Sequence, residues 1–200
     1  MPNWVDSVIT VHGEPSRIAE AVAVLRAPRP FAVRPEGEPF GTPSGIEMTE
    51  IPNGQFSFWG TSHPDEEQWP MYFGLIETDR LQPFWYQWNN AWWGTKWDAC
   101  DAELLQDYAG GFMLRFSTAW SFPEPWLNDF AEMFPDLDYE VEWEEEQGYG
   151  ARLVWVDGDF LVADQWAIPT SHADLEDRDR ECLCVVYNER MFDDCPEVQS

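Results

Sequence analysis

Carboxylates are the most abundant chemically active groups in this chain, and the densest set of them lies between residues 138 and 146. The stretch DYEVEWEEE alternates Tyr, Val and Trp with Glu, which predicts a strand with one apolar face and one acidic face. Carboxylates on such a face would follow one another about 6.6 Å apart, a row of negative charge comparable to the phosphates of a nucleic-acid strand. The alternative is a solvated outer face. The candidate partner-binding residues are Glu140, Glu142, Glu144, Glu145 and Glu146.

The net charge of the chain favours the same kind of partner. Thirty-eight Asp and Glu oppose 11 Lys and Arg, which gives a formal charge of −27. A field of this sign repels nucleic acids and anionic membrane surfaces and attracts basic proteins. We therefore expect a partner with a basic surface, no direct binding to nucleic acid and no binding to membranes. A GC-rich genome or a salty cytoplasm would also produce few lysines and many carboxylates.

Self-repulsion at this charge predicts that the folded state becomes more stable as salt is added, because added ions screen the repulsion between carboxylates. Urea unfolding in about 0.1 M and about 1 M NaCl, where the screening length falls from about 10 Å to about 3 Å, measures this effect. We expect a higher unfolding midpoint in the higher salt. An unchanged midpoint would contradict the prediction.

A second candidate is the stretch WWGTKWD at residues 92–98, which holds the single lysine of the chain. Glycine permits a tight turn between tryptophans, and the lysine can pair with the following aspartate or stack on an indole ring. The stretch could form a binding pocket. Because aromatic clusters usually belong to a core, we favour a structural role in which the lysine neutralises a buried carboxylate. The structural signature comprises Trp93, Gly94, Lys96, Trp97 and Asp98.

Patterns for metal binding are weak. A histidine and three cysteines near the C-terminus offer zinc-type ligands, but their spacing matches no standard zinc knuckle. A small zinc-binding structural or interaction protein therefore remains an alternative, and we predict no metal ligands. Asp157-Gly158-Asp159 is the sequence that a hairpin turn requires, so it does not by itself predict a calcium site. The zinc-type residues are His172, Cys182, Cys184 and Cys195.

Patterns for catalysis are equally weak. His12, His63 and His172 lie in unrelated contexts, and no nucleophile elbow, phosphate loop or metalloprotease motif is present. Cys100 is expected to be a small buried apolar residue. RNA binding on an open sheet would need basic residues that this chain lacks. We predict that the protein is not an enzyme and has no cofactor, with an uncharacterised enzyme as a further alternative.

The elements that position these residues follow from periodicity. Alternation predicts strands at 3–12, 112–119, 138–146, 151–156, 160–163 and 182–187, whereas residues 98–109 suit a short helix or a strand. Helical spacing predicts helices capped by Ser16, started by Pro83, and capped by Ser121 in a capping box with Glu124. This order predicts an α+β fold in which an antiparallel sheet packs two helices on one face.

Two hundred residues suit a single domain with a sizeable core. Its predicted parts are a first strand and helix in 1–27, an insertion in 28–90, the rest of the core in 91–167 and an acidic extension in 168–200. Proline, glycine and aromatic patches in 29–82 predict elaborated loops folded onto the domain. Neither a signal peptide nor a membrane-spanning run is found, and the four cysteines suit no disulfide framework, so we expect a cytoplasmic protein.

Several motifs resemble the YubB-like family of plasmid and phage accessory proteins. They fall in family order within residues 1–27 and 91–165, and they include MPNW at 1–4, WGTKWD at 93–98, FSTAW at 116–120 and FPDL at 134–137. The resemblance implies a ferredoxin-like core and a mobile-element setting, without catalytic residues. Combined with the charge, it predicts an accessory protein that binds a host protein in the host cytoplasm. In its sharpest form, it is a DNA-mimic inhibitor of a defence or nucleic-acid-processing system.

Overall fold

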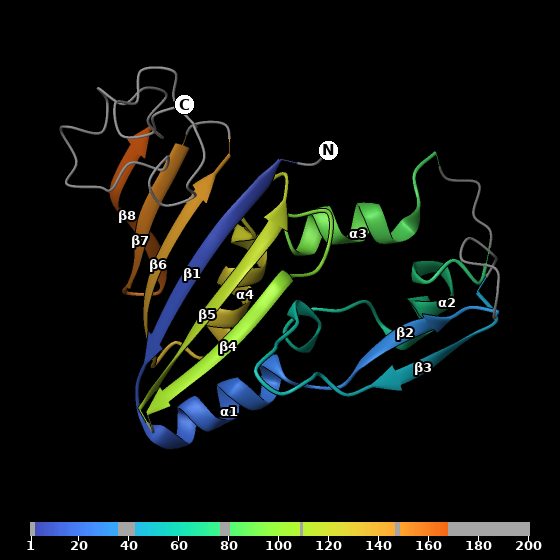
Figure 1. The fold of residues 1–200 in the computed structure, drawn as a ribbon, viewed down its shortest axis with the longest axis horizontal. Coiled ribbons are helices and arrows are strands. Elements are labelled where there is room, and N and C mark those ends of the chain that lie inside the picture. Colours follow the sequence, from blue (N-terminus) through green and yellow to red (C-terminus); the bar gives the residue numbers. More distant parts are fainter. Residues whose placement is uncertain (1–2, 36–42, 77–80, 109, 147–148, 168–200) are drawn as a thin grey trace, which may run out of the picture.

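The structure, a computed structural model, describes residues 3–35, 43–76, 81–108, 110–146 and 149–167. Within these residues, six strands form one antiparallel sheet in the order β4-β5-β1-β6-β7-β8 (Figure 1). The predicted extension at 168–200, with its strand at 182–187, lies outside the described residues. The strands are β1 (Trp4–His12), β4 (Cys100–Tyr108), β5 (Gly111–Ala119), β6 (Asp138–Glu145), β7 (Tyr149–Val156) and β8 (Asp159–Ala167).

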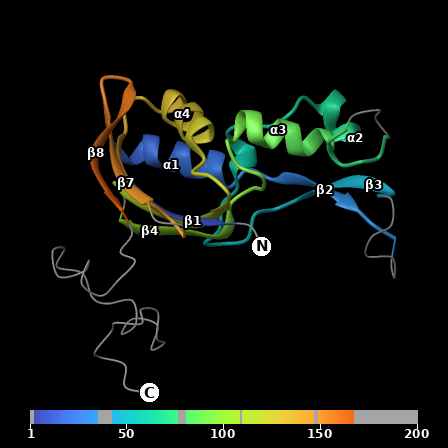
Figure 2. The ribbon, with the colours of Figure 1, turned by 90° about the horizontal axis from the view of Figure 1, so that it is seen from above.

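The helices α1 (Pro15–Leu25) and α4 (Glu124–Met133) lie on the same side of this sheet (Figure 2). In chain order the core runs β1, α1, β4, β5, α4, β6, and its strands lie side by side as β4-β5-β1-β6. This is the ferredoxin-like arrangement, extended at one edge by β7 and β8. The predicted α+β fold is therefore confirmed.

The burial of side chains along the central strand β1 follows the alternation of its sequence. Val5, Ile9 and Val11 are 1% exposed or less, whereas Asp6 and His12 are exposed. Hydrogen-bonded neighbours on both edges, β5 and β6, hold this strand in the middle of the sheet. One face of the strand must therefore pack on helices, and its apolar residues occupy that face.

Both predicted serine caps are wrong. The helix α1 begins at Pro15, with Glu14 as its N-cap, so Ser16 lies within the first turn. Proline suits the first helical position because it lacks an N–H group and has a fixed φ. The N-cap of α4 is Pro123, and the hydroxyl of Ser121 instead donates to the backbone carbonyl of Gly94 at 2.5 Å.

Residues 28–90 contain more regular structure than the predicted loops. The strands β2 (Arg29–Val33) and β3 (Gly45–Thr49) form a separate antiparallel pair, and the helices α2 (Trp69–Tyr72) and α3 (Phe84–Trp92) follow. These two strands were not predicted because proline and glycine usually indicate loops. Pro30 lies within β2 itself, which is possible because an edge strand tolerates proline. The helix predicted after Pro83 is confirmed as α3, and it ends at Trp92, which is 53% exposed.

Aromatic side chains from 56–59 complete the main core. Phe58 is fully buried, and its ring centroid lies 4.2 Å from that of Trp126 in α4. The same phenylalanine meets Phe116 of β5 edge-on at 5.5 Å and Trp93 at 5.9 Å. The segment between β3 and α2 is thus part of the hydrophobic core that the sheet and helices share.

Candidate functional site

The face of the six-stranded sheet opposite α1 and α4 is open in the described part of the chain (Figure 2). A hollow of about 580 Å³ lies on this face over β1, β4, β5 and β6. Five carboxylates and one guanidinium line it, which leaves a formal charge of −4. We call this surface the acidic face; its carboxylates are Asp6, Asp101, Glu103, Glu142 and Glu144.

Strand register brings these residues together. Asp6 lies between Ser117 of β5 and Glu144 of β6, and the Ser117 hydroxyl donates to Asp6 Oδ1 at 2.5 Å. Two residues further along β1, Val8 lies between Arg115 of β5 and Glu142 of β6. Carboxylates more than 130 residues apart in the chain therefore meet at the centre of the sheet.

The predicted glutamates divide between several environments. Glu140, Glu142 and Glu144 lie on the open face, as the alternation of β6 predicts. Glu144 accepts a hydrogen bond at 2.7 Å from the indole nitrogen of Trp166 in β8. Because side chains alternate, Glu145 belongs to the opposite face of the strand, and it is half-buried.

Glu146 follows the end of β6 and is exposed. Its Oε2 accepts a hydrogen bond at 3.1 Å from the backbone N–H of Trp4. This glutamate therefore helps to hold the start of β1, and the five predicted residues do not form one continuous row.

Two arginines interrupt the negative charge of the open face. Arg115 lies 3.6 Å from Glu103, and Arg152 of β7 lies 3.5 Å from Glu140. All four side chains are at least 45% exposed, so each pair contributes little to stability. Of the carboxylates that line the hollow, Asp6, Asp101, Glu142 and Glu144 are outside these two pairs, and Asp6, Glu142 and Glu144 are the ones on the neighbouring strands β1 and β6.

Three carboxylates of the acidic face were not predicted as site residues from the sequence. Asp6 is among the polar residues of the first predicted strand, and Asp101 and Glu103 follow Cys100 at alternate positions. Residues 98–109 suited either a helix or a strand, so no face could be assigned to them. The alternation of acidic residues is visible in each segment of the sequence. However, only the pairing of β4 with β5 and of β1 with β6 places these residues on the same face as the glutamates.

The stretch at 92–98 lies elsewhere, where the insertion meets the core. Trp93 is 1% exposed and meets the ring of Trp88 edge-on at 5.4 Å. The ammonium of Lys96 lies over the rings of Trp97 and Trp120, 4.6 and 4.4 Å from their centroids. The lysine thus makes cation–π contacts, and within the described residues it forms no ion pair with a carboxylate, so the expected counter-ion role is not found there.

Asp98 takes Arg29 as its ionic partner, with Nη1 2.8 Å from Oδ2. The same oxygen accepts the hydroxyl of Ser57 at 2.6 Å. The other oxygen, Oδ1, accepts the backbone N–H groups of Phe58 and Ala99, both at 2.8 Å. One carboxylate therefore joins β2, the start of the 3₁₀ turn at Phe58–Gly60 and the residue before β4.

His172, Cys182, Cys184 and Cys195 lie outside the described residues. Within the described ranges, no group of three or more His, Cys, Asp or Glu is arranged to hold a metal ion. Asp157 and Gly158 form the turn between β7 and β8, as the hairpin pattern predicts.

Cys100 is half-buried at the start of β4, less enclosed than predicted. Burial, with Asp98 and Asp101 nearby, raises the pKa of its thiol, which disfavours the reactive thiolate. His12 is exposed at the end of β1, whereas the ring of His63 stacks on Trp59 with centroids 5.5 Å apart. These separate positions form no catalytic arrangement among themselves.

Comparisons with known proteins support the fold. Residues 90–182 match the family model described as a ferredoxin-like domain in Api92-like protein. The crystal structure of protein api92 from Yersinia pseudotuberculosis superimposes with a TM-score of 0.51, covering 84% of this chain and 99% of the other. At 9% identity, this likeness shows the fold alone. No curated protein matches the sequence.

The predicted resemblance to the YubB-like family stays a prediction, because the match is to Api92-like proteins. In the described ranges, no helix combines the length and apolar character that crossing a membrane requires.

Proposed function

We propose that this protein binds a basic protein partner through the acidic face. The observation that carries the proposal is the convergence of carboxylates from β1, β4 and β6 on one hollow with a formal charge of −4. Helices cover the other side of the same sheet, whereas the described residues leave this face open to a large partner (Figure 2). A lysine or arginine of the partner would enter the hollow and pair with Asp6, Glu142 or Glu144.

Mimicry of DNA is the sharper form of this proposal. Successive carboxylates on one face of β6 stand about 6.6 Å apart, a row that a phosphate-binding groove could accept in place of a nucleic-acid backbone. The total charge of −27 adds a long-range field that accelerates encounter with a basic surface. The partner would be a host defence or nucleic-acid-processing protein, met in the host cytoplasm by a mobile-element accessory protein.

The test compares two triple variants that remove the same charge from different places. Asp6→Asn/Glu142→Gln/Glu144→Gln neutralises the centre of the acidic face, and its amides can still accept the hydrogen bonds from Ser117 and Trp166. The control Glu66→Gln/Glu67→Gln/Glu132→Gln neutralises three exposed carboxylates outside this sheet. Host proteins captured by the wild type would be identified, and their affinity for each variant measured by calorimetry.

We expect the acidic-face variant to bind the captured partner at least about tenfold more weakly, because each lost partner-facing charge contact contributes on the order of 1 kcal/mol. The control variant should bind as the wild type does. Affinity should fall steeply with salt, and duplex DNA should compete with this protein for the partner. Equal losses of affinity in both variants would show that net charge alone determines binding. Failure of duplex DNA to compete for the partner would rule out DNA mimicry.

A further inference from the structure

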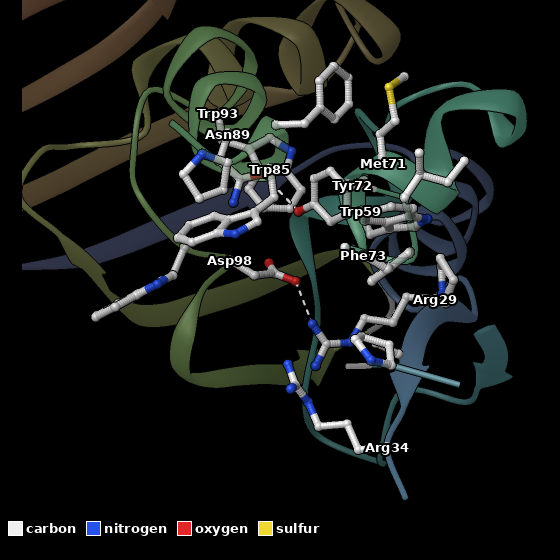
Figure 3. A pocket seen from close by; sticks show the side chains of 18 residues that line it. Arg29, Arg34, Trp59, Met71, Tyr72, Phe73, Trp85, Asn89, Trp93 and Asp98 are labelled. Carbon is white, nitrogen blue, oxygen red and sulfur yellow. Dashed lines mark hydrogen bonds and ion pairs between the residues drawn. The ribbon is translucent and has the colours of Figure 1, made fainter. Parts of the chain in front are cut away.

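A second cavity, of about 700 Å³, lies away from the acidic face, where β2 meets α2 and α3 (Figure 3). Its volume falls in the range of small-molecule sites, which is roughly 300 to 1,000 Å³. Seven of its 18 lining residues are aromatic. The rings that line it are those of Trp59, Tyr72, Phe73, Phe84, Trp85, Trp93 and Trp97.

The charge of this cavity is opposite to that of the molecule. Its charged lining residues are Arg29, Arg34 and Asp98, a formal charge of +1 in a chain of −27. Figure 3 shows both guanidinium groups on the Asp98 side of the cavity. Asp98 already accepts from Ser57, Phe58 and Ala99 in addition to Arg29, so its charge is shared among several donors.

The aromatic wall is held in place by hydrogen bonds. The hydroxyl of Tyr72 donates to Asn89 Oδ1 at 2.8 Å, and Asn89 Nδ2 donates to the carbonyl of Lys96 at 2.9 Å. Burial raises the pKa of Tyr72, with the charge of Asp98 adding to the effect, so the phenol stays neutral and keeps donating. Trp59 meets Tyr72 edge-on at 5.3 Å and Trp93 at 6.4 Å. The wall is therefore formed before any ligand arrives.

We infer that this cavity binds a small ligand that joins a planar aromatic ring to an anionic group. The ring would lie against the indole and phenyl walls, where offset or edge-on contact with aromatic side chains is favourable. The anion would meet Arg29 and Arg34, whose planar guanidinium groups suit carboxylate and phosphate oxygens. A nucleotide and an aromatic carboxylate share this chemistry. The site is independent of the acidic face and of any protein partner.

Calorimetric titration of the full chain with AMP and with indole-3-acetate tests the inference and distinguishes the two sources of the anion. We expect saturable binding of at least one probe with a Kd at or below about 1 mM. Adenosine, which has the ring without the phosphate, should bind at least about tenfold more weakly than AMP if the nucleotide is the preferred class. Tryptamine, a cation, is the corresponding comparison for indole-3-acetate.

Arg34→Gln is the informative variant because Arg34 is exposed and lies after the end of β2, so its loss should leave the fold intact. We expect it to weaken binding of the anionic probe at least about tenfold and to leave binding of the uncharged ring unchanged. Arg152→Gln on the open sheet face is the matched control and should bind as the wild type does. The inference is overturned if neither probe saturates, or if Arg34→Gln and Arg152→Gln weaken binding equally.

Discussion

Replacing Asp98 with asparagine is expected to lower the free energy of unfolding by about 3 kcal/mol. The side chain is 16% exposed and accepts from four donors: Arg29, Ser57 and the backbone N–H groups of Phe58 and Ala99. Asparagine keeps one acceptor oxygen, so its amide N–H₂ would face donors on the other side. At least one of those donors would be left buried without a partner.

The size of the effect follows from which contacts are lost. A hydrogen bond to a charged group contributes about 1.5 to 3 kcal/mol, and an unpaired buried donor costs about 1 to 3 kcal/mol. The Arg29 side chain is 45% exposed, so we assign its ion pair a small share. Most of the loss therefore comes from the contacts with Ser57 and Phe58, which tie the insertion to the start of β4.

Urea unfolding of the Asp98→Asn variant measures this loss, and Asp129→Asn is its control. Asp129, on α4, is also half-buried, and it accepts from the hydroxyl of Ser62. An amide oxygen can accept that bond, so we expect the control to lose about 1 kcal/mol or less. Equal losses in the two variants would show that Asp98 has no special anchoring role.

Replacing Gly94 with alanine is expected to cost about 3 kcal/mol. The backbone at Gly94 has φ +76°, a region that residues with a Cβ rarely adopt. A Cβ there would also lie 2.5 Å from Cδ of Pro125, in the first turn of α4. The turn that carries the signature stretch would then push against the helix that supplies Trp126 to the core.

Two further variants separate the two causes. Gly54 has φ +78° with no atom within 4 Å of an added Cβ, so Gly54→Ala should show the backbone cost alone, about 1 kcal/mol. Adding Pro125→Ala to Gly94→Ala removes the opposing ring atoms and should restore part of the stability. If thermal or urea unfolding gave the same loss for Gly94→Ala and Gly54→Ala, the predicted clash would be absent.

The sequence by itself determined the elements whose periodicity is local. The strand at 3–12, the strand at 138–146 and the hairpin around Asp157 and Gly158 were each predicted from one segment, because alternation is a property of a single strand. Those segments also predicted which face of β1 and β6 is buried. The order of strands and helices then favoured the α+β class before any contact between segments was known.

Only the tertiary structure decided what lies beside what. Asp6, Glu103 and Glu142 come to line one hollow through the register of three strand pairs. In the same way, Lys96 contacts the ring of Trp120, and Arg29 pairs with Asp98. Each of these contacts joins residues that are far apart in the chain, so no local pattern encodes it. Ser121 illustrates the same limit: its sequence suits a helix cap, but its hydroxyl reaches Gly94, because a nearby acceptor outweighs a weak local preference.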